Sequence, residues 1–146
     1  MVNRLRTGHI NLKETGLPQV PMIAIVDDDA SVREATKGLV RSLGYRVATY
    51  GSAGEFLSSM GLHETSCLIT DVQMPGFDGL ELQSLLIAQG NRVPVIFITG
   101  FPEAHIRARA MEAGALGFLG KPFDDESLIA CLDKALATDA AAVSRE

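Results

Sequence analysis

Cys67-Leu68-Ile69-Thr70-Asp71 is an apolar run that ends on an acid, and Val72-Gln73-Met74-Pro75-Gly76-Phe77-Asp78-Gly79 follows it directly. The apolar run predicts a buried strand, and the proline and glycines of the next segment predict that the strand breaks at once into a loop. In open α/β sheets, ligands bind at the carboxyl ends of the strands. Asp71 is therefore predicted to lie at a ligand-binding edge.

Similar apolar runs recur on both sides of this strand and alternate with segments of helical periodicity. A parallel sheet with helices on both faces is the usual result of such alternation. We therefore predict an α/β fold: a single doubly wound five-stranded parallel sheet with five helices. The predicted strands are Met22–Val26, Tyr45–Tyr50, Cys67–Thr70, Pro94–Ile98 and Ala115–Leu119.

The predicted helices carry start signals. Capping boxes are expected at Ser31–Glu34, at Ser52–Glu55 and at Asp78–Glu81, and Asp124 is expected to cap the last helix. The second helix is expected to bury Met60 together with two neighbouring apolar side chains.

Composition excludes several classes of protein. The 146 residues are 47% hydrophobic and 21% charged, which is typical of one globular domain. A net charge of -5 argues against direct nucleic-acid binding, and no apolar stretch is long enough for a membrane span. Cys67 and Cys131 have no paired spacing and are interpreted as two buried thiols in a reducing cytoplasm.

Three regions follow from the patterning. Residues 1–21 lack periodicity and are expected to be a flexible N-terminal leader, with a short helix over Leu5–Leu12 as the alternative. The domain itself spans 22–137. Residues 138–146 are rich in alanine and are expected to be a C-terminal tail or a linker stub.

Side chains with reactive chemistry follow successive strands. The acidic run Asp27–Asp29, Asp71, Thr99 and Lys121 each come at a predicted strand end, and right-handed crossovers bring these ends to one edge. Clustered carboxylates repel one another unless a cation lies between them, and their oxygens suit Mg²⁺ or Mn²⁺. An aspartate can accept a phosphoryl group, while the lysine and the hydroxyl can bind its oxygens.

Taken singly, these motifs have ordinary explanations. The run Asp27–Asp29 could complement a helix dipole, and Thr99-Gly100 and Lys121-Pro122 are common loop dipeptides. Asp78 is better explained as a helix cap than as a ligand. Their coincidence at the ends of strands of one sheet favours a common site.

The sequence resembles the receiver domain of bacterial two-component response regulators over Met22 to about Ala137, and the nitrogen-fixation and nodulation branch in particular. The resemblance implies the flavodoxin-like receiver fold with strand order 2-1-3-4-5. The motifs that carry it are Ile25–Asp29, Thr70–Gly79, Ile98–Gly100 and Gly120–Phe123.

The resemblance also implies site roles. Asp71 would take a phosphoryl group from a phosphohistidine of a sensor histidine kinase. Asp28, Asp71 and the main-chain carbonyl of Gln73 would bind Mg²⁺ (or Mn²⁺), and Asp27 would hold a metal-bound water. Lys121 would contact the phosphate, and its peptide bond to Pro122 would be cis.

A conformational switch is implied as well. Thr99 would move towards the phosphate, and Phe118 would turn inward in step. The output face would comprise Ile106–Met111, Phe118 and Leu128–Leu132, and it would support a phosphorylation-dependent homodimer or bind an output-domain partner. Phe101, two residues after Thr99, is expected to shield the acyl phosphate from water.

Two other functions compete with this signalling module, which would catalyse only its own phosphoryl uptake and loss. A magnesium-dependent phosphatase with an aspartate nucleophile typically carries a second Asp where this chain has Gln73. A flavodoxin-like cofactor binder would want a phosphate loop after the first strand, where Asp27–Asp29 would repel phosphate. Whether the receiver stands alone or is detached from a DNA-binding regulator stays open.

Overall fold

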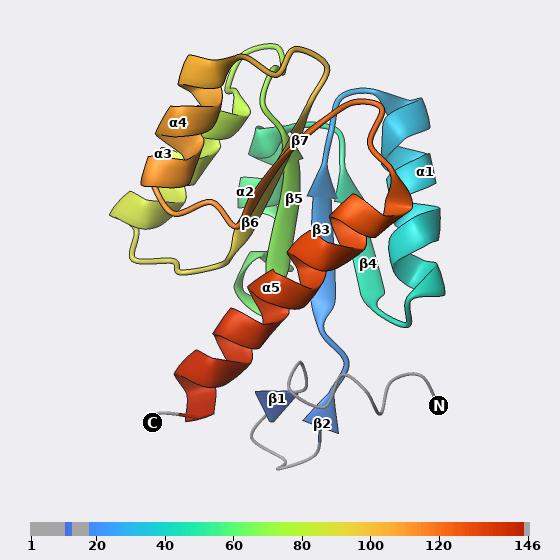
Figure 1. Cartoon of the computed structure of the whole chain (residues 1–146). Helices are drawn as coiled ribbons and strands as arrows, with labels where there is room; N and C mark the ends of the chain where they lie inside the picture. The colour runs from blue at the N-terminus through green and yellow to red at the C-terminus, as the bar shows by residue number, and fades with distance from the viewer. Residues whose placement is uncertain (1–10, 13–17, 145–146) are drawn as a thin grey trace.

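The computed structural model describes residues 11–12 and 18–144, and its centre is one parallel sheet (Figure 1). The strand order is β4-β3-β5-β6-β7. Numbered within this sheet alone, the order is 2-1-3-4-5, which confirms the predicted fold. The strands are β3 (Met22–Val26), β4 (Arg46–Tyr50), β5 (Cys67–Asp71), β6 (Val95–Thr99) and β7 (Gly117–Gly120).

Helices cover both faces of the sheet. One face is covered by α1 (Ala30–Ser42) and α5 (Asp125–Ser144). The other is covered by α2 (Ala53–Ser58), α3 (Gly79–Ala88) and α4 (Ala104–Glu112), while a short 3-10 helix, η2 (Leu62–Glu64), precedes β5.

Each central strand supplies both layers of the core, because successive side chains of a strand point to opposite faces. In β3, Ile23 and Ile25 pack in the cluster beneath α1 and α5. Ala24 and Val26 pack in the cluster beneath α2, α3 and α4. This double burial explains why the strands are continuous apolar runs.

The predicted caps of α3 and α1 and the predicted burial of Met60 had different outcomes. The capping box at Asp78 and Glu81 is present. The box predicted at Ser31 is wrong, because Asp29 is the N-cap and its side chain accepts hydrogen bonds from the Ser31 and Val32 amides. Met60 is 93% exposed, because α2 ends at Ser58 and the chain has already turned away from the core.

Two short strands and the end of a helix lie in the segments predicted as a leader and a tail. In the leader, β1 (Asn11–Leu12) pairs antiparallel with β2 (Pro18–Gln19), so the alternative helix does not include its last two residues; residues 5–10 lie outside the described part.

Helix α5 continues to Ser144, past the boundary predicted at residue 137. No glycine or proline interrupts this alanine-rich segment, and alanine has the highest helix propensity. In the described part of the chain, no helix combines the length and the apolar character needed to cross a bilayer.

Candidate functional site

The carboxyl ends of four neighbouring strands bring the predicted site residues to one edge of the sheet. Asp27 follows β3, Asp71 ends β5 and Thr99 ends β6, while Lys121 follows β7. Parallel pairing places β5 between β3 and β6, so Asp71 lies at the centre of this edge. The fold therefore juxtaposes residues that are far apart in the sequence.

Three acids form a cluster at this edge. One carboxylate oxygen from each of Asp27, Asp28 and Asp71 lies within 4.8 Å of the other two. Asp27 and Asp71 are buried, and Asp28 is exposed. The Oδ2 atom of Asp27 is buried and has no partner in hydrogen-bond geometry. Hard carboxylate oxygens this close to one another fit a divalent cation such as Mg²⁺.

Lys121 supplies positive charge to the same cluster. Its Nζ atom donates a hydrogen bond of 3.0 Å to Oδ2 of Asp71. It also lies 3.0 Å from Oδ2 of Asp27, with which it forms an ion pair. One ammonium between two buried carboxylates leaves negative charge uncompensated. The Lys121–Pro122 peptide bond is cis.

The pKa values of the pair reflect this environment. Burial raises the pKa of Asp71, and repulsion from Asp27 adds to that rise, while the hydrogen bond from Lys121 opposes it. Burial alone would lower the pKa of Lys121, but its interactions with Asp71 and Asp27 outweigh burial and raise that pKa. Lys121 is therefore firmly protonated at neutral pH.

The main chain around Asp71 is held by short-range contacts. The amide of Gln73 donates to Asp71 Oδ1 at 3.2 Å, and Gly79 donates to the carbonyl of Val72 at 2.8 Å. A Cβ atom on Gly79 would overlap the carbonyl oxygen of Asp71 and stand 3.0 Å from the Val72 Cα. Gly79 was not singled out from the sequence, although a glycine directly after a helix cap was a visible signal.

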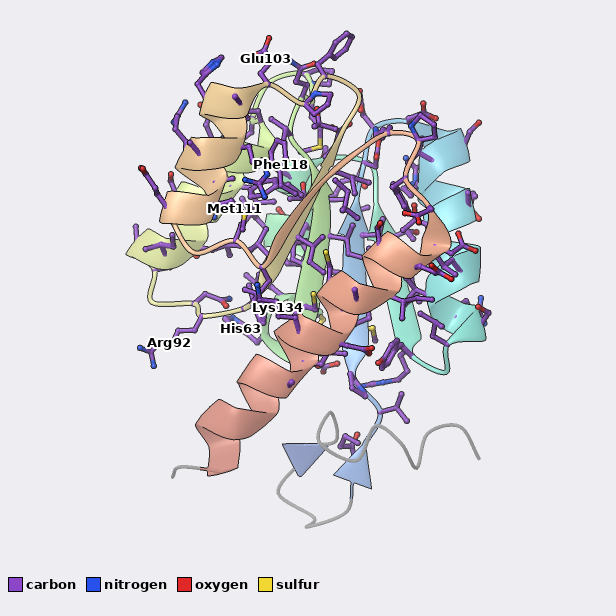
Figure 2. The ribbon with its side chains drawn as sticks, viewed as in Figure 1. His63, Arg92, Glu103, Met111, Phe118 and Lys134 are labelled. Carbon is purple, nitrogen blue, oxygen red and sulfur yellow. The ribbon has the colours of Figure 1, made fainter. Side chains whose placement is uncertain are left out.

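The predicted switch residues lie on the neighbouring strands. Thr99 is buried, and its Oγ1 accepts a hydrogen bond of 3.1 Å from the amide of Phe101. The ring of Phe118 is 6.3 Å from that of Phe97, at 49°. Figure 2 labels Phe118 and Met111 on the side of the sheet that α4 covers, and both pack against the core cluster there.

One part of the expected output face is wrong. Leu128 and Leu132 on α5 are fully buried in the core beneath α1 and α5, so they cannot contact a partner. Their spacing of four residues places both side chains on the inward face of the helix. Residues Ile106, Met111 and Phe118 are half-buried between α4 and β7.

A further contact at the site was missed in the sequence. The guanidinium of Arg33, near the start of α1, donates a hydrogen bond of 2.7 Å to the main-chain carbonyl of Asp27. Its only signal was a basic residue shortly after the acidic run, and such a residue is usually a solvated helix position.

Comparison with known proteins gives matches to one family over most of the chain. The family described as "Response regulator receiver domain" matches residues 23–133. The chain is 43% identical over 133 residues to "Response regulator protein TmoT" of Ectopseudomonas mendocina, covering 91% of this chain and 58% of that protein. It is 43% identical over 108 residues to "Nodulation protein W" of Bradyrhizobium diazoefficiens, covering 74% and 48% respectively.

A solved structure agrees as well. The "Low Resolution Structure of Response Regulator StyR" superposes with a TM-score of 0.80 at 38% identity, covering 87% of this chain and 64% of that one. The chain thus spans about half the length of the curated relatives named above.

Proposed function

The chain belongs to the response regulator receiver family, and from this premise we propose that it is a phosphorylation-switched signalling module whose phosphoacceptor is Asp71. The observation that carries the proposal is the ion pair of Lys121 with Asp71 inside a cluster of three acids. Such a cluster combines a nucleophile, a fixed cation and metal ligands at one point. A magnesium-dependent phosphatase would need a general acid two residues after Asp71, and Gln73 stands at that position.

The proposed reaction is a transfer between two side chains. A carboxylate oxygen of Asp71 attacks the phosphorus of a phosphohistidine on a sensor histidine kinase. The bond between phosphorus and oxygen forms as the bond between phosphorus and imidazole nitrogen breaks, and the imidazole keeps the electron pair. Lys121, held beside Asp71, binds an oxygen of the transferred group.

The acids would hold Mg²⁺, with Mn²⁺ as a substitute. Asp28, Asp71 and the main-chain carbonyl of Gln73 are the proposed ligands, and Asp27 would hold a metal-bound water. When bound, the ion supplies the positive charge that offsets the acids and the incoming phosphoryl group. The close approach of the three carboxylates supports this assignment.

The proposed switch links the phosphate to the surface near α4. Thr99 would exchange its hydrogen bond from the Phe101 amide for one to the phosphate, and Phe118 would then turn inward. A partner or a second copy would read the change at the surface formed by α4, β7 and α5. The regulated output, in a second domain or a separate partner, belongs to this proposal, as does a cytoplasmic location.

Intact-mass measurement tests the proposal directly. The protein is incubated with acetyl phosphate, with and without Mg²⁺, beside an Asp71→Asn variant. We expect one phosphoryl adduct that requires Mg²⁺ and is absent from the variant. No adduct under any condition would mean a receiver fold that does not use this chemistry, and an adduct on Asp71→Asn would place the acceptor elsewhere.

Phe101 gives a second test. Phe101 is 66% exposed, and its amide donates a hydrogen bond to Thr99 Oγ1 at the site. We propose that the ring slows the approach of water to the acyl phosphate, so Phe101→Ala should shorten the phosphoryl half-life. The decay is followed by intact mass after removal of the donor, with Met60→Ala as the control for loss of an exposed apolar side chain. An unchanged or longer half-life contradicts shielding.

A further inference from the structure

Arg33 reaches from α1 back to the chain that leads into the helix. Its Nη1 atom donates a hydrogen bond of 2.7 Å to the main-chain carbonyl of Asp27, just beyond the end of β3. The side chain is partly buried. This contact therefore joins α1 to the turn that carries the first two acids of the cluster.

The contact completes a set that fixes Asp27. Its amide donates to the carbonyl of Tyr50 on β4 at 3.1 Å, and its Oδ1 accepts from the amide of Asp29 at 2.9 Å. With Arg33 on its carbonyl, the residue is held at its amide, its side chain and its carbonyl. A peptide group is planar, so fixing this carbonyl also fixes the amide of Asp28. It therefore also fixes the direction of the chain at Asp28, just after β3.

The positive charge of Arg33 also favours the cluster of acids. A guanidinium stays protonated at every pH that the folded protein tolerates. Here it is bonded to a main-chain carbonyl, so it adds positive charge beside the acids without occupying the Asp27 carboxylate. The guanidinium lies beside Gly51 in the loop after β4, where a Cβ would stand at the ordinary contact distance of 3.7 Å from Nη1.

We propose that Arg33 is a positioning residue for the metal site. By holding the peptide group between Asp27 and Asp28, it directs the exposed Asp28 carboxylate towards those of Asp27 and Asp71. The inference rests on the proposed function, because it assumes that the three acids bind a divalent cation. It goes further by assigning part of the metal affinity to a residue that touches no ligand oxygen.

The test measures metal binding apart from phosphorylation. Mn²⁺ is titrated into the full chain, and the free ion is followed by electron paramagnetic resonance. Arg33→Met is compared with Arg41→Met, which removes the same charge from the far end of the same helix. Arg33→Lys keeps the charge, and Arg33→Gln serves if the Met variant loses its native circular dichroism spectrum.

We expect Arg33→Met to raise the Kd for Mn²⁺ about tenfold or more, a usual effect of losing a residue that orients a metal ligand. Arg41→Met should bind like the wild type, and Arg33→Lys should recover part of the loss. With acetyl phosphate, the Mg²⁺ concentration for half-maximal rate should rise by the same factor. The rate at saturating Mg²⁺ should stay within about twofold of the wild type.

Three results would overturn the inference. Equal Kd values for Arg33→Met and Arg41→Met exclude a positioning role. A lower rate at saturating Mg²⁺ with an unchanged Kd would assign Arg33 to the phosphoryl transfer or to general stability instead. A wild-type protein that binds no Mn²⁺ at millimolar concentration removes the metal site itself, and the proposed function then fails together with the inference.

Discussion

At the residue scale, the structure leaves no space for a side chain on Gly79, beside Asp71. Any side chain at position 79 must displace the main chain that carries the proposed phosphoacceptor, because a Cβ there would meet the Asp71 carbonyl and the Val72 Cα. Backbone atoms cannot rotate away as a side chain can. The glycine therefore allows α3 to begin directly against the loop that follows Asp71.

Gly79→Ala should therefore slow phosphorylation by acetyl phosphate about tenfold to a hundredfold, because small displacements of a reacting group have effects of that size. Gly38→Ala is the matched control. Nothing lies within 4 Å of a Cβ at this mid-helix position, so its rate should be unchanged and its free energy of unfolding should rise by about 0.5–1 kcal/mol. Equal rates for both variants would contradict the steric argument.

The negative charge of Asp71 lowers the free energy of unfolding of the metal-free protein. Burial and repulsion from Asp27 raise its pKa above the ordinary value of 3.8. The contribution of Asp71 to the free energy of unfolding is fully present below pH 3.8, and it is lost as the pH rises through the raised pKa. At neutral pH the ionised carboxylate therefore destabilises the fold.

Asp71→Asn should consequently melt at a higher temperature than the wild type at pH 7 in EDTA. Lys121 keeps its ion pair with Asp27 in this variant. The difference should shrink as the pH is lowered towards the raised pKa, as measured by circular dichroism. Asp125→Asn, an acid in the first turn of α5, should show no such gain. If the wild type melts at a higher temperature than Asp71→Asn at pH 7, the ionised Asp71 does not destabilise the fold.

At the element scale, β7 and α5 meet at Gly117. A Cβ on this glycine would overlap the Sγ of Cys131 and stand 3.2 Å from its Cβ and 3.4 Å from a methyl group of Ile96. The helix lies against the strand at a distance that only hydrogen at position 117 permits. The sequence did not indicate this contact, since the thiol and the glycine are on different elements.

Gly117→Ala should lower the free energy of unfolding by about 1–3 kcal/mol, the usual cost of overpacking a core. Adding Cys131→Ala removes the overlapping sulfur, so the double variant should recover most of that loss. Denaturant unfolding of the four proteins forms a double-mutant cycle, and the two changes should not be additive. Additive effects would mean that the strand and helix do not press on each other here.

The features that the sequence predicts correctly at this scale are those that neighbouring residues determine. Buried strands and the Asp78 cap depend on neighbouring residues, and they were predicted correctly. The convergence of strand ends follows from handedness alone, so the residues of the proposed site could be chosen in advance. Arg33 and Gly117 could not be assigned, because their roles depend on contacts between elements. Met60 was misplaced because a short helix gives few residues from which to fix its end.

At the scale of the whole molecule, the expected response to phosphorylation is association. Phe118 packs with α4 at the surface proposed to form a homodimer. Light scattering on a sizing column should therefore show a doubled mass after treatment with Mg²⁺ and acetyl phosphate. Asp71→Asn should remain at the mass of one chain under the same conditions. An unchanged mass for a protein that intact-mass analysis finds phosphorylated would exclude the homodimer.

The two core layers have a consequence for how such a chain can evolve. The core cluster beneath α1 and α5 and the one beneath α2, α3 and α4 share no side chain. A substitution in one can therefore be compensated by a neighbour in the same layer, without a matching change across the sheet. Substitutions beneath α2, α3 and α4 can thus be accommodated without changing the side chains beneath α1 and α5.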